Sequence, residues 1–458
     1  MGLRRIGLVI LVYFLPIVGC YAGEHFPGAR WQHASPQATG WSAAKLAKAE
    51  AWSNQIGSTA VMVIEHGLVV AQWGDTAART PLASVRKSLL SALIGIAVAR
   101  HQIDLDATLD ALHINDSAPS LSAEEKAATV RDLLEARSGV YHPACYESRW
   151  MAKLRPLRYS HKPDTFWYYN NWDFNTLGAI YVQATGASIF GAFEREIARP
   201  IGMQDYRPSD GRYSTCNASV YPAYPFHMSA RDLARFALLY LNHGMWNGRQ
   251  IVPAQWVEDS VQPYSQSGFG PGYGYLWWTG FADNNVAPIV KLPVGTFFAW
   301  GFGGQFAFVI PADDLVVVSR APHAPGGPSL REMGRLLWLI LDAGGYSDIG
   351  PDASLAAAHG THEDGAELAR LLPGKTLMWG DGPFLTRMNP DHTFVFYRGS
   401  QGVTEDSGSW SVVGDEVCRY SRRFDPHDAC LDVVRDGAQL EFFGGNGLMV
   451  AEAHMVGQ

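Results

Sequence analysis

The sequence predicts an α+β protein, in which an antiparallel β-sheet is flanked by helices, with an inserted helical subdomain and a small all-β C-terminal domain. Three observations predict this arrangement. Residues 60–73 form two β-branched runs that meet at His66-Gly67, as in a hairpin. A second pair of such runs comes late, at residues 305–310 and 315–319, with helical segments between the two pairs. We expect the four strands to share one sheet.

The segment between the two strand pairs is predicted to be largely helical. Residues 88–99 are apolar almost all round, which is typical of a helix buried on several faces. A closing helix should follow the late strands and cover the sheet. The further helices are expected at residues 130–134, 174–185, 230–241 and 330–342.

The length and the composition divide the chain into domains. At 458 residues it exceeds the size at which one hydrophobic core keeps growing. Residues 344–365 are rich in Gly, Ala, Asp, His and Pro and predict a linker between a main domain at 23–343 and a tail module at 366–458. Short alternating segments in the tail predict an all-β module. Its expected strands are residues 375–379, 384–388, 393–397, 409–413 and 430–434.

Composition excludes several classes of protein. With 47% apolar and 17% charged residues, the chain is typical of a folded globular protein and not of a disordered one. A net charge of −8 leaves no basic surface for a phosphate backbone, so we expect no nucleic-acid partner. Neither a C-x-x-C nor an H-E-x-x-H spacing occurs, and we therefore predict no metal and no cofactor.

The N-terminus predicts export. Two arginines precede an apolar run at residues 6–18, which is too short to span a bilayer and is typical of a secretory signal. The mature protein is therefore expected in the periplasm or the medium, without a transmembrane span. Two alternatives remain: a signal peptide at 1–22, or a lipoprotein signal at 1–19 with a lipid anchor on Cys20.

Four cysteines remain after export, Cys145, Cys216, Cys418 and Cys430. An even number in an oxidising compartment permits two disulfides. Cys418 and Cys430 lie close together in a β-rich region and are the natural pair. The pairing of Cys145 with Cys216 is left open, and buried free thiols are the alternative for all four.

The candidate nucleophile is Ser84, followed by Lys87 three residues later. Residues at this spacing share one face of a helix, where the amine can take the proton that keeps a serine hydroxyl unreactive. Ser42 and Lys45 repeat the spacing in a polar stretch, which is typical of a solvated helix with a serine cap. The alternative for Ser84 is likewise a capping serine with a lysine that reaches solvent. We favour catalysis because Lys87 would enter an apolar interior.

Residues 81–97 resemble the nucleophile segment of the class C β-lactamase-like serine hydrolases, a superfamily that includes penicillin-binding proteins and many esterases. Residues 167–178 are similar to the second motif of this family, Y-x-N followed by Leu-Gly. Two registers fit, and counting back from Leu-Gly favours Tyr169 and Asn171 over the pair one residue earlier. The resemblance implies that Tyr169 relays a proton and that Asn171 hydrogen-bonds the substrate.

The third motif of the family, K-T-G or H-x-G on a strand beside the site, resembles residues 299–305. Ala299 stands where relatives carry a cation that helps to hold the carboxylate of a β-lactam, which places efficient β-lactam hydrolysis in doubt. Gly301 still allows close approach of a substrate carbonyl, and the N–H groups of Phe302 and Ser84 are the implied oxyanion hole.

Further segments, at residues 133–139, 228–234 and 273–278, look like landmarks of the branch that resembles 6-aminohexanoate-dimer hydrolases and their esterase relatives. The resemblance covers residues 40–343 and implies an acyl-enzyme on Ser84 that cleaves a small-molecule ester or amide. The alternative is a non-hydrolytic penicillin-binding-like or ligand-sensing protein on the same scaffold. Side chains considered as borders of the pocket, of which one or two tryptophans should touch substrate, are His142, Trp172, Trp277, Trp278 and Trp300.

Overall fold

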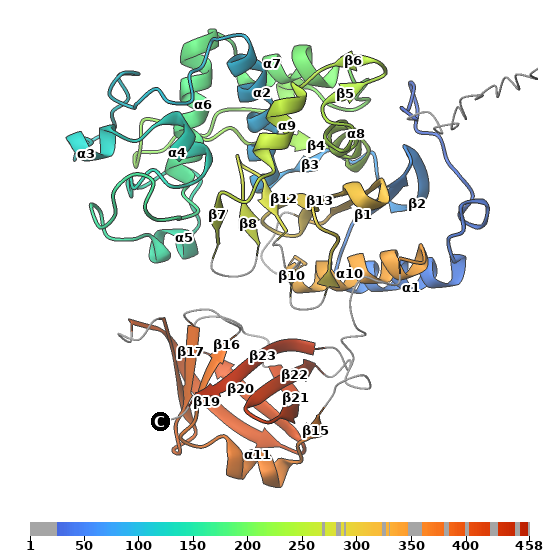
Figure 1. Cartoon of the computed structure of the whole chain (residues 1–458), viewed down its shortest axis with the longest axis vertical. Helices are drawn as coiled ribbons and strands as arrows, with labels where there is room; N and C mark the ends of the chain where they lie inside the picture. The colour runs from blue at the N-terminus through green and yellow to red at the C-terminus, as the bar shows by residue number, and fades with distance from the viewer. Residues whose placement is uncertain are drawn as a thin grey trace, which may run out of the picture.

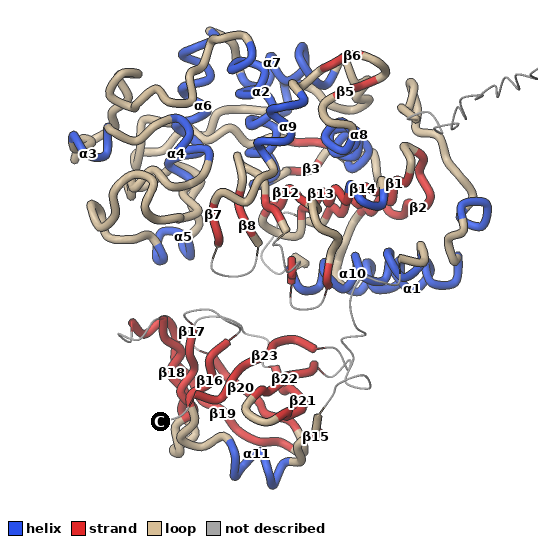
Figure 2. Tube along the Cα trace, in the orientation of Figure 1, coloured by secondary structure: helices blue, strands red, loops and turns tan. Residues whose placement is uncertain are grey.

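The computed structural model shows a main domain followed by an all-β domain (Figures 1 and 2). The predicted signal segment with Cys20 and most of the predicted linker lie outside the residues that the structure describes. Those residues are 25–267, 271–280, 285–287, 290–322, 327–328, 330–346, 360–379, 384–398, 403–421, 429–444 and 449–456.

An antiparallel sheet of eight strands forms the centre of the main domain. Its strands are β1 (Ala60–Glu65), β2 (Leu68–Gly74), β7 (Ser265–Gln266), β8 (Gly272–Tyr273), β9 (Trp278–Thr279), β12 (Phe297–Gly301), β13 (Gln305–Ile310) and β14 (Leu315–Arg320). Their order is β2-β1-β14-β13-β12-β9-β8-β7. The four predicted strands therefore share one sheet, and β1 joins β2 through the predicted hairpin, where His66 and Gly67 adopt positive φ.

Helices cover both faces of this sheet (Figure 1). On one face, α8 (Ala230–Leu241) packs against β1, β13 and β14. On the other face, α1 (Ala43–Gln55) and α10 (Leu330–Ala343) pack against each other. Every residue of β1, β13 and β14 is consequently buried, which explains why their sequences are apolar except at the ends.

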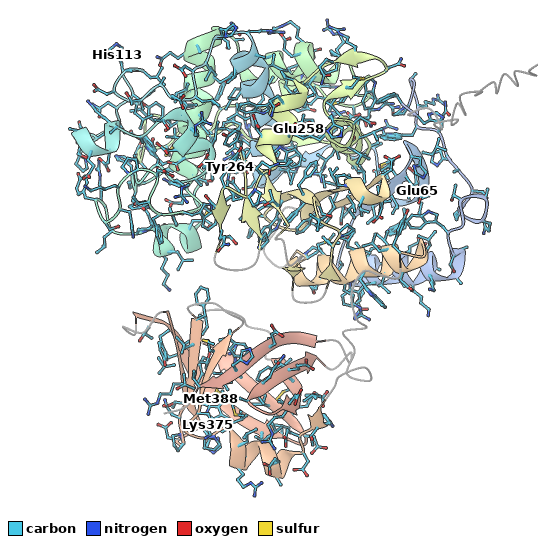
Figure 3. All side chains as sticks on the ribbon, viewed as in Figure 1. Glu65, His113, Glu258, Tyr264, Lys375 and Met388 are labelled. Carbon is cyan, nitrogen blue, oxygen red and sulfur yellow. A yellow bond between two sulfur atoms is a disulfide. The ribbon has the colours of Figure 1, made fainter. Side chains whose placement is uncertain are left out.

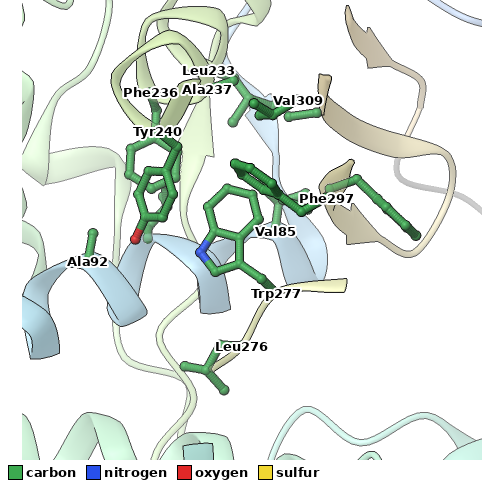
Figure 4. Packing of buried hydrophobic residues seen from close by; sticks show 14 of the residues in the cluster. Val85, Ala92, Leu233, Phe236, Ala237, Tyr240, Leu276, Trp277, Phe297 and Val309 are labelled. Atoms are coloured by element: carbon green, nitrogen blue, oxygen red, sulfur yellow. The ribbon is translucent and has the colours of Figure 1, made fainter. Parts of the chain in front are cut away.

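Aromatic side chains join the helical layer to the sheet. Trp277 is fully buried between Tyr240 of α8 and Phe297 of β12, with ring centroids 4.5 and 5.2 Å away (Figure 4). Val85, which directly follows the candidate nucleophile, and Ala92 of the next helix contribute to the same core. The core of the main domain thus reaches directly under the predicted site.

The helical subdomain lies between the two strand pairs, as predicted. Its longest helices are α2 (Arg86–Ala99), in which every residue up to Ala97 is buried, and α6 (Asn171–Thr185). The shorter helices are α3 (Ala123–Lys126), α4 (Val130–Leu134), α5 (Arg149–Leu154), α7 (Ile189–Phe193) and α9 (Ala254–Ser260), with a π-helical turn η3 (Glu194–Ala198) and 3₁₀ turns η2 (Ala83–Val85) and η4 (Pro208–Asp210). Outside this subdomain, the 3₁₀ turn η1 (Pro36–Thr39) precedes β1, and η5 (Pro311–Asp313) lies between β13 and β14.

Six short strands form small ribbons outside the main sheet. They are β3 (Thr80–Pro81) with β4 (His227–Met228), β5 (Met245–Trp246) with β6 (Arg249–Gln250), and β10 (Asn285–Ala287) with β11 (Val290–Lys291). The β3–β4 ribbon matters for function, since η2 and the candidate nucleophile follow β3 directly.

The C-terminal domain is a closed barrel in which each strand pairs with the next and the last returns to the first. The barrel strands are β16 (Thr376–Trp379), β17 (Phe384–Met388), β18 (Thr393–Arg398), β19 (Val403–Val413), β20 (Glu416–Ser421), β21 (Ala429–Asp436), β22 (Gln439–Gly444) and β23 (Met449–Val456). Inside it, Trp410, Phe394 and Met388 are buried; Figure 3 labels Met388. The expected small all-β domain is therefore confirmed.

The C-terminal end of the predicted linker, residues 344–365, already has regular structure. Here β15 (Thr361–His362) pairs with β21 of the barrel. The next helix, α11 (Gly365–Leu371), begins at an N-cap, Asp364, whose carboxylate accepts from Glu367 N. In this stretch, the polar composition that predicted a linker therefore belongs to an edge strand and to the start of a helix.

Two disulfides are present. Cys418 and Cys430 are joined across the paired strands β20 and β21, as predicted. Cys145 and Cys216 are also joined, which decides the pairing that the sequence left open.

No single helix in the described part of the chain has the length and apolar character of a membrane span. The bent pair formed by α6 and Ile189–Ala198 meets the requirement by length and composition alone.

Candidate active site

Ser84 lies in a tight turn between β3 and α2. Leu82 N donates to Phe226 O at 2.9 Å, and Ala83 adopts a left-handed φ of 48°, a conformation that costs a residue other than glycine of the order of 1–3 kcal/mol. The turn continues as η2 into α2. No side chain caps α2, and the predicted alternative of Ser84 as a helix cap is therefore wrong.

Lys87 is the residue that the structure brings to Ser84. Its ammonium nitrogen lies 3.1 Å from Ser84 Oγ and 2.6 Å from the hydroxyl of Tyr169. The same nitrogen lies over the rings of Tyr169 and Phe174, 3.9 and 4.3 Å from their centroids. Lys87 is only 1% exposed, so it does not reach solvent as the alternative required.

The geometry selects one of the two registers of the second motif. Tyr169 contacts Lys87, whereas the hydroxyl of Tyr168 donates to Met151 O at 2.7 Å, away from the nucleophile. Asn170, the asparagine of the register that begins at Tyr168, caps α6, because its side-chain oxygen accepts a hydrogen bond from Trp172 N. The register that begins at Tyr169 is therefore the one in contact with Ser84 and Lys87.

Asn171 occupies the first position of α6 and is 3% exposed. Its side-chain nitrogen donates to Tyr146 O at 2.7 Å. Its side-chain oxygen is buried and has no hydrogen-bond partner among the described residues. Asn171 therefore holds the loop that carries Tyr146, and its side-chain oxygen remains available to accept a hydrogen bond.

The predicted third motif lies on β12, beside the nucleophile. A Cβ built on Gly301 would lie 2.4 Å from Leu82 O and 3.1 Å from Ser84 N, so the end of this strand is pressed against the serine turn. Phe302 follows in the turn after β12 and is 56% exposed. Only glycine fits at position 301, because a side chain there would collide with the backbone of the serine turn.

The pKa values of Lys87 and Tyr169 are shifted in opposite directions. Burial lowers the pKa of Lys87 well below its ordinary value, and the neighbouring charge of Arg86 lowers it further. Burial raises the pKa of Tyr169 to about 12, against smaller opposing effects of a hydrogen bond from Ser84 and the charge of Arg86. The pair is thus suited to a neutral amine that accepts a proton and a neutral phenol that donates one.

The side chains considered as borders of the pocket separate into two groups. Trp278 stacks on Tyr169 with centroids 5.3 Å apart, and Trp300 contacts Trp278 at 5.3 Å. Trp172 and Trp277 are fully buried core residues and present no surface to a substrate. His142 is buried too, with its two ring nitrogens 3.0 Å from Pro143 O and 3.1 Å from Ser117 O, and its place next to the pocket is not supported.

The second serine–lysine pair serves as an internal comparison. The hydroxyl of Ser42 accepts from Lys45 N and caps α1, and Lys45 forms an exposed ion pair with Asp342. The Ser42–Lys45 pair therefore forms a solvated helix start, as its polar surroundings predicted. No group of His, Cys, Asp or Glu that could hold a metal occurs within the described ranges.

Sequence reasoning missed the second cation of the site. Arg86 is 0% exposed, and its guanidinium lies 4.5 Å from the ring centroid of Tyr224 and 5.6 Å from that of Tyr146. The signal was present in the motif itself, because two consecutive basic residues open a helix whose next twelve residues are uncharged. The two tyrosines lie far from this motif in sequence and could not have been found from it.

A helix-covered antiparallel sheet, with a buried lysine in contact with both a serine and a tyrosine, is the arrangement expected of a β-lactamase-like serine hydrolase. The sequence profile of the Beta-lactamase family matches residues 43–342, which is more than half of the chain. The chain therefore belongs to the β-lactamase family.

Solved structures agree on the fold. A Bacillus anthracis protein assigned as a 6-aminohexanoate-dimer hydrolase superimposes with a TM-score of 0.50 at 21% identity, covering 65% of this chain and 82% of that one. A Bacteroides dorei protein assigned as a β-lactamase gives a TM-score of 0.50 at 14% identity, covering 66% and 99%. These likenesses establish the fold.

A curated relative resembles a shorter stretch. An uncharacterized protein of Alkalihalophilus pseudofirmus is 29% identical over 126 residues, which are 27% of this chain and 37% of that protein. The match thus spans little more than a third of the relative's length.

Proposed function

We propose that this protein is an exported serine hydrolase that cleaves an ester or amide bond of a small molecule through an acyl-enzyme on Ser84. One observation carries the proposal. A buried lysine nitrogen contacts both the serine hydroxyl, at 3.1 Å, and a tyrosine hydroxyl, at 2.6 Å. Such a three-residue chain can move a proton from the nucleophile to a leaving group without the help of bulk water.

In the acylation step, Ser84 Oγ attacks the carbonyl carbon of the substrate while Lys87 Nζ takes the hydroxyl proton. The electron pair of the carbonyl bond moves to oxygen and forms a tetrahedral oxyanion. When this oxyanion collapses, the bond to the leaving alcohol or amine breaks, and the leaving atom takes a proton from Tyr169. Lys87 returns its proton to Tyr169 across their hydrogen bond, so both residues end in their starting states.

In the deacylation step, water attacks the acyl carbon and gives its proton to the Lys87–Tyr169 pair. The bond between the acyl carbon and Ser84 Oγ then breaks, and Oγ recovers the proton. The net reaction is hydrolysis of one ester or amide to an acid and an alcohol or amine. Both steps depend on a Lys87 amine that is unprotonated near neutral pH, which its burial favours.

The oxyanion of both steps would be held by two backbone N–H groups, those of Ser84 and Phe302. The position of Gly301 supports this role, because its missing Cβ lets β12 approach within contact distance of Ser84 N. Loss of one such donor in other hydrolases typically costs about 10²–10³ in turnover. The third-motif glycine is therefore proposed as a requirement of catalysis and not of the fold alone.

The substrate is proposed to be a small ester or linear amide in preference to a β-lactam. Ala299 is buried on β12 and supplies no cation for a substrate carboxylate. Trp278 and Trp300 form an aromatic border next to Tyr169, which suits an apolar acyl group. The 6-aminohexanoate-dimer hydrolase assignment of the Bacillus anthracis protein is in line with a linear amide.

Export is part of the same proposal. The N-terminal sequence is typical of a secretory signal, with a lipid anchor at Cys20 as the alternative to free release. The two disulfides support an oxidising compartment, because such bonds are rare in the reducing cytosol.

Intact-mass analysis after treatment with a fluorophosphonate probe tests the function. We expect the parent protein to gain the mass of one probe and Ser84→Ala to gain none. Ser42→Ala is the matched control, since it alters the other serine–lysine pair and should label like the parent. Hydrolysis of short p-nitrophenyl esters is measured in parallel on all three proteins.

The outcomes separate the two candidate functions. Labelling at Ser84 together with ester turnover supports the hydrolase. Labelling without turnover of esters or linear amides favours the penicillin-binding-like or sensing alternative, in which the acyl group stays on the serine. If Ser84→Ala labels like the parent, Ser84 is not the nucleophile and the proposal fails.

A further inference from the structure

Arg86 is a buried cation without an anionic partner, and it lies directly beside the lysine of the site. It is the first residue of α2 and is 0% exposed. None of its three guanidinium nitrogens has a hydrogen-bond partner within the described part of the chain. Burying a charge in this way is costly, and proteins normally compensate it with a carboxylate or with several acceptors.

Two other arginines of the main domain show how this chain normally buries a guanidinium. Arg235 donates to the carbonyls of Pro27, Gly28 and Ile201. Arg320 is bound in the same way, through acceptors supplied by Gln305, Met228, Thr80 and Pro81. Arg86 differs from both, because the faces of Tyr224 and Tyr146 are what surrounds its charge. Aromatic faces attract a cation but do not neutralise it.

The phenols that face Arg86 and Lys87 are neutral at physiological pH. Burial raises the pKa of Tyr224 and of Tyr273, and that of Tyr169 to about 12, so each phenol keeps its proton. The buried carboxyl near these rings is Asp173 in the first turn of α6. Burial raises its pKa well above the ordinary value, and it is hydrogen-bonded to Ser138 and Asn170 instead of to Arg86.

We propose that Arg86 is a positioning residue, whose uncompensated buried charge disfavours a second positive charge on Lys87 and so keeps the amine ready to accept the proton of Ser84. This inference rests on the proposed hydrolase function. Two like charges in one low-dielectric site repel strongly, and a buried lysine amine is the side chain that readily shifts to its neutral form under such repulsion. The tyrosine rings hold the guanidinium in place without cancelling its field.

The pH dependence of fluorophosphonate labelling tests the proposal. Labelling requires the Lys87 amine in its neutral form, so the rate rises with pH through a midpoint that reports on that amine. We expect Arg86→Met to raise this midpoint by about one pH unit or more, the usual size of an effect between close charges. At a pH below both midpoints the rate should fall about tenfold, and it should recover at alkaline pH.

Two further variants make the result specific. Arg86→Lys keeps a positive charge at the position and should return the midpoint towards that of the parent. Arg100→Gln removes an exposed positive charge at the C-cap of α2, thirteen residues after Lys87, roughly 20 Å away and beyond the screening length in physiological salt. Its midpoint should equal that of the parent.

A midpoint that stays in place in Arg86→Met overturns the proposal, as does a rate lowered equally at every pH, which is what a purely structural role produces. If Arg86→Met does not fold, Tyr146→Ala decides. Tyr146 is 41% exposed, and its removal admits water that screens Arg86, so the midpoint should still rise, by a smaller amount. An unchanged midpoint there overturns the proposal. A parent protein that never labels contradicts the hydrolase function itself.

Discussion

Replacement of Gly301 by alanine tests how closely the third motif is fitted to the nucleophile. The new Cβ would lie 2.4 Å from Leu82 O, about 1 Å short of ordinary contact, and 3.1 Å from Ser84 N. The first contact is with backbone of a tight turn, which has no flexible end to give way. The strand and the serine turn must therefore separate by roughly 1 Å.

The expected cost follows from that displacement. A misplacement of about 1 Å at a catalytic group can reduce turnover by about 10²-fold, and loss of an oxyanion donor has a similar effect. Overpacking of this kind lowers the free energy of unfolding by about 1–3 kcal/mol, which should leave the protein folded. Gly301→Ala should therefore label with fluorophosphonate about a hundred times more slowly while it still shows a cooperative thermal transition.

The matched control is Gly191→Ala in α7. A Cβ on this glycine meets nothing within 4 Å, and alanine in a helix gains up to about 1 kcal/mol over glycine. Labelling of this variant should match the parent, with equal or higher thermal stability. If Gly301→Ala labels within twofold of the parent at unchanged stability, the close fit between β12 and Ser84 is refuted.

Three further predictions concern stability. Because burial lowers the pKa of Lys87, the unfolded chain binds more protons than the folded one between that lowered pKa and the ordinary value, so this lysine costs most stability at low pH. Lys87→Met should abolish labelling and raise the melting temperature more at pH 6 than at pH 9; an equal shift at both would contradict the buried, depressed amine. Gly95→Ala would place a Cβ about 2.2 Å from the ring of Trp256, and urea unfolding should show a loss of about 1–3 kcal/mol with near-parent labelling of the folded fraction. Serine replacement of both Cys145 and Cys216 opens a 71-residue loop and should cost about 2–5 kcal/mol in the same assay; a loss below 1 kcal/mol would mean that the bond does not constrain the chain.

Much of the fold was predictable because its elements have strong local patterns. The β1–β2 hairpin combines β-branched runs with a His-Gly turn, and α8 spans the predicted residues 230–241. The strands β7, β8 and β9 were not predicted. Each has only two residues, too few for any alternation, and they form because a neighbouring strand offers free hydrogen-bonding groups.

The barrel likewise contains strands that the sequence predicted and strands that it did not. Residues 416–421, 439–444 and 449–456 are short segments that include charged side chains, and β20, β22 and β23 were missed. They become strands because closure of a barrel requires every edge to be paired. The number of strands therefore follows from closure and not from the sequence of any one strand.

The sequence by itself predicted the candidate chemistry. The spacing of Ser84 and Lys87 at the start of an apolar helix follows from local residues, and Gly301 was identified through the resemblance to a family motif. Only the tertiary structure decided that Tyr169 and not Tyr168 reaches Lys87, that Cys145 joins Cys216, and that Arg86 is buried between two tyrosine rings. The physical reason is that hydrogen bonds and charge effects depend on distance in space, and these partners are 60 to 138 residues apart in the chain.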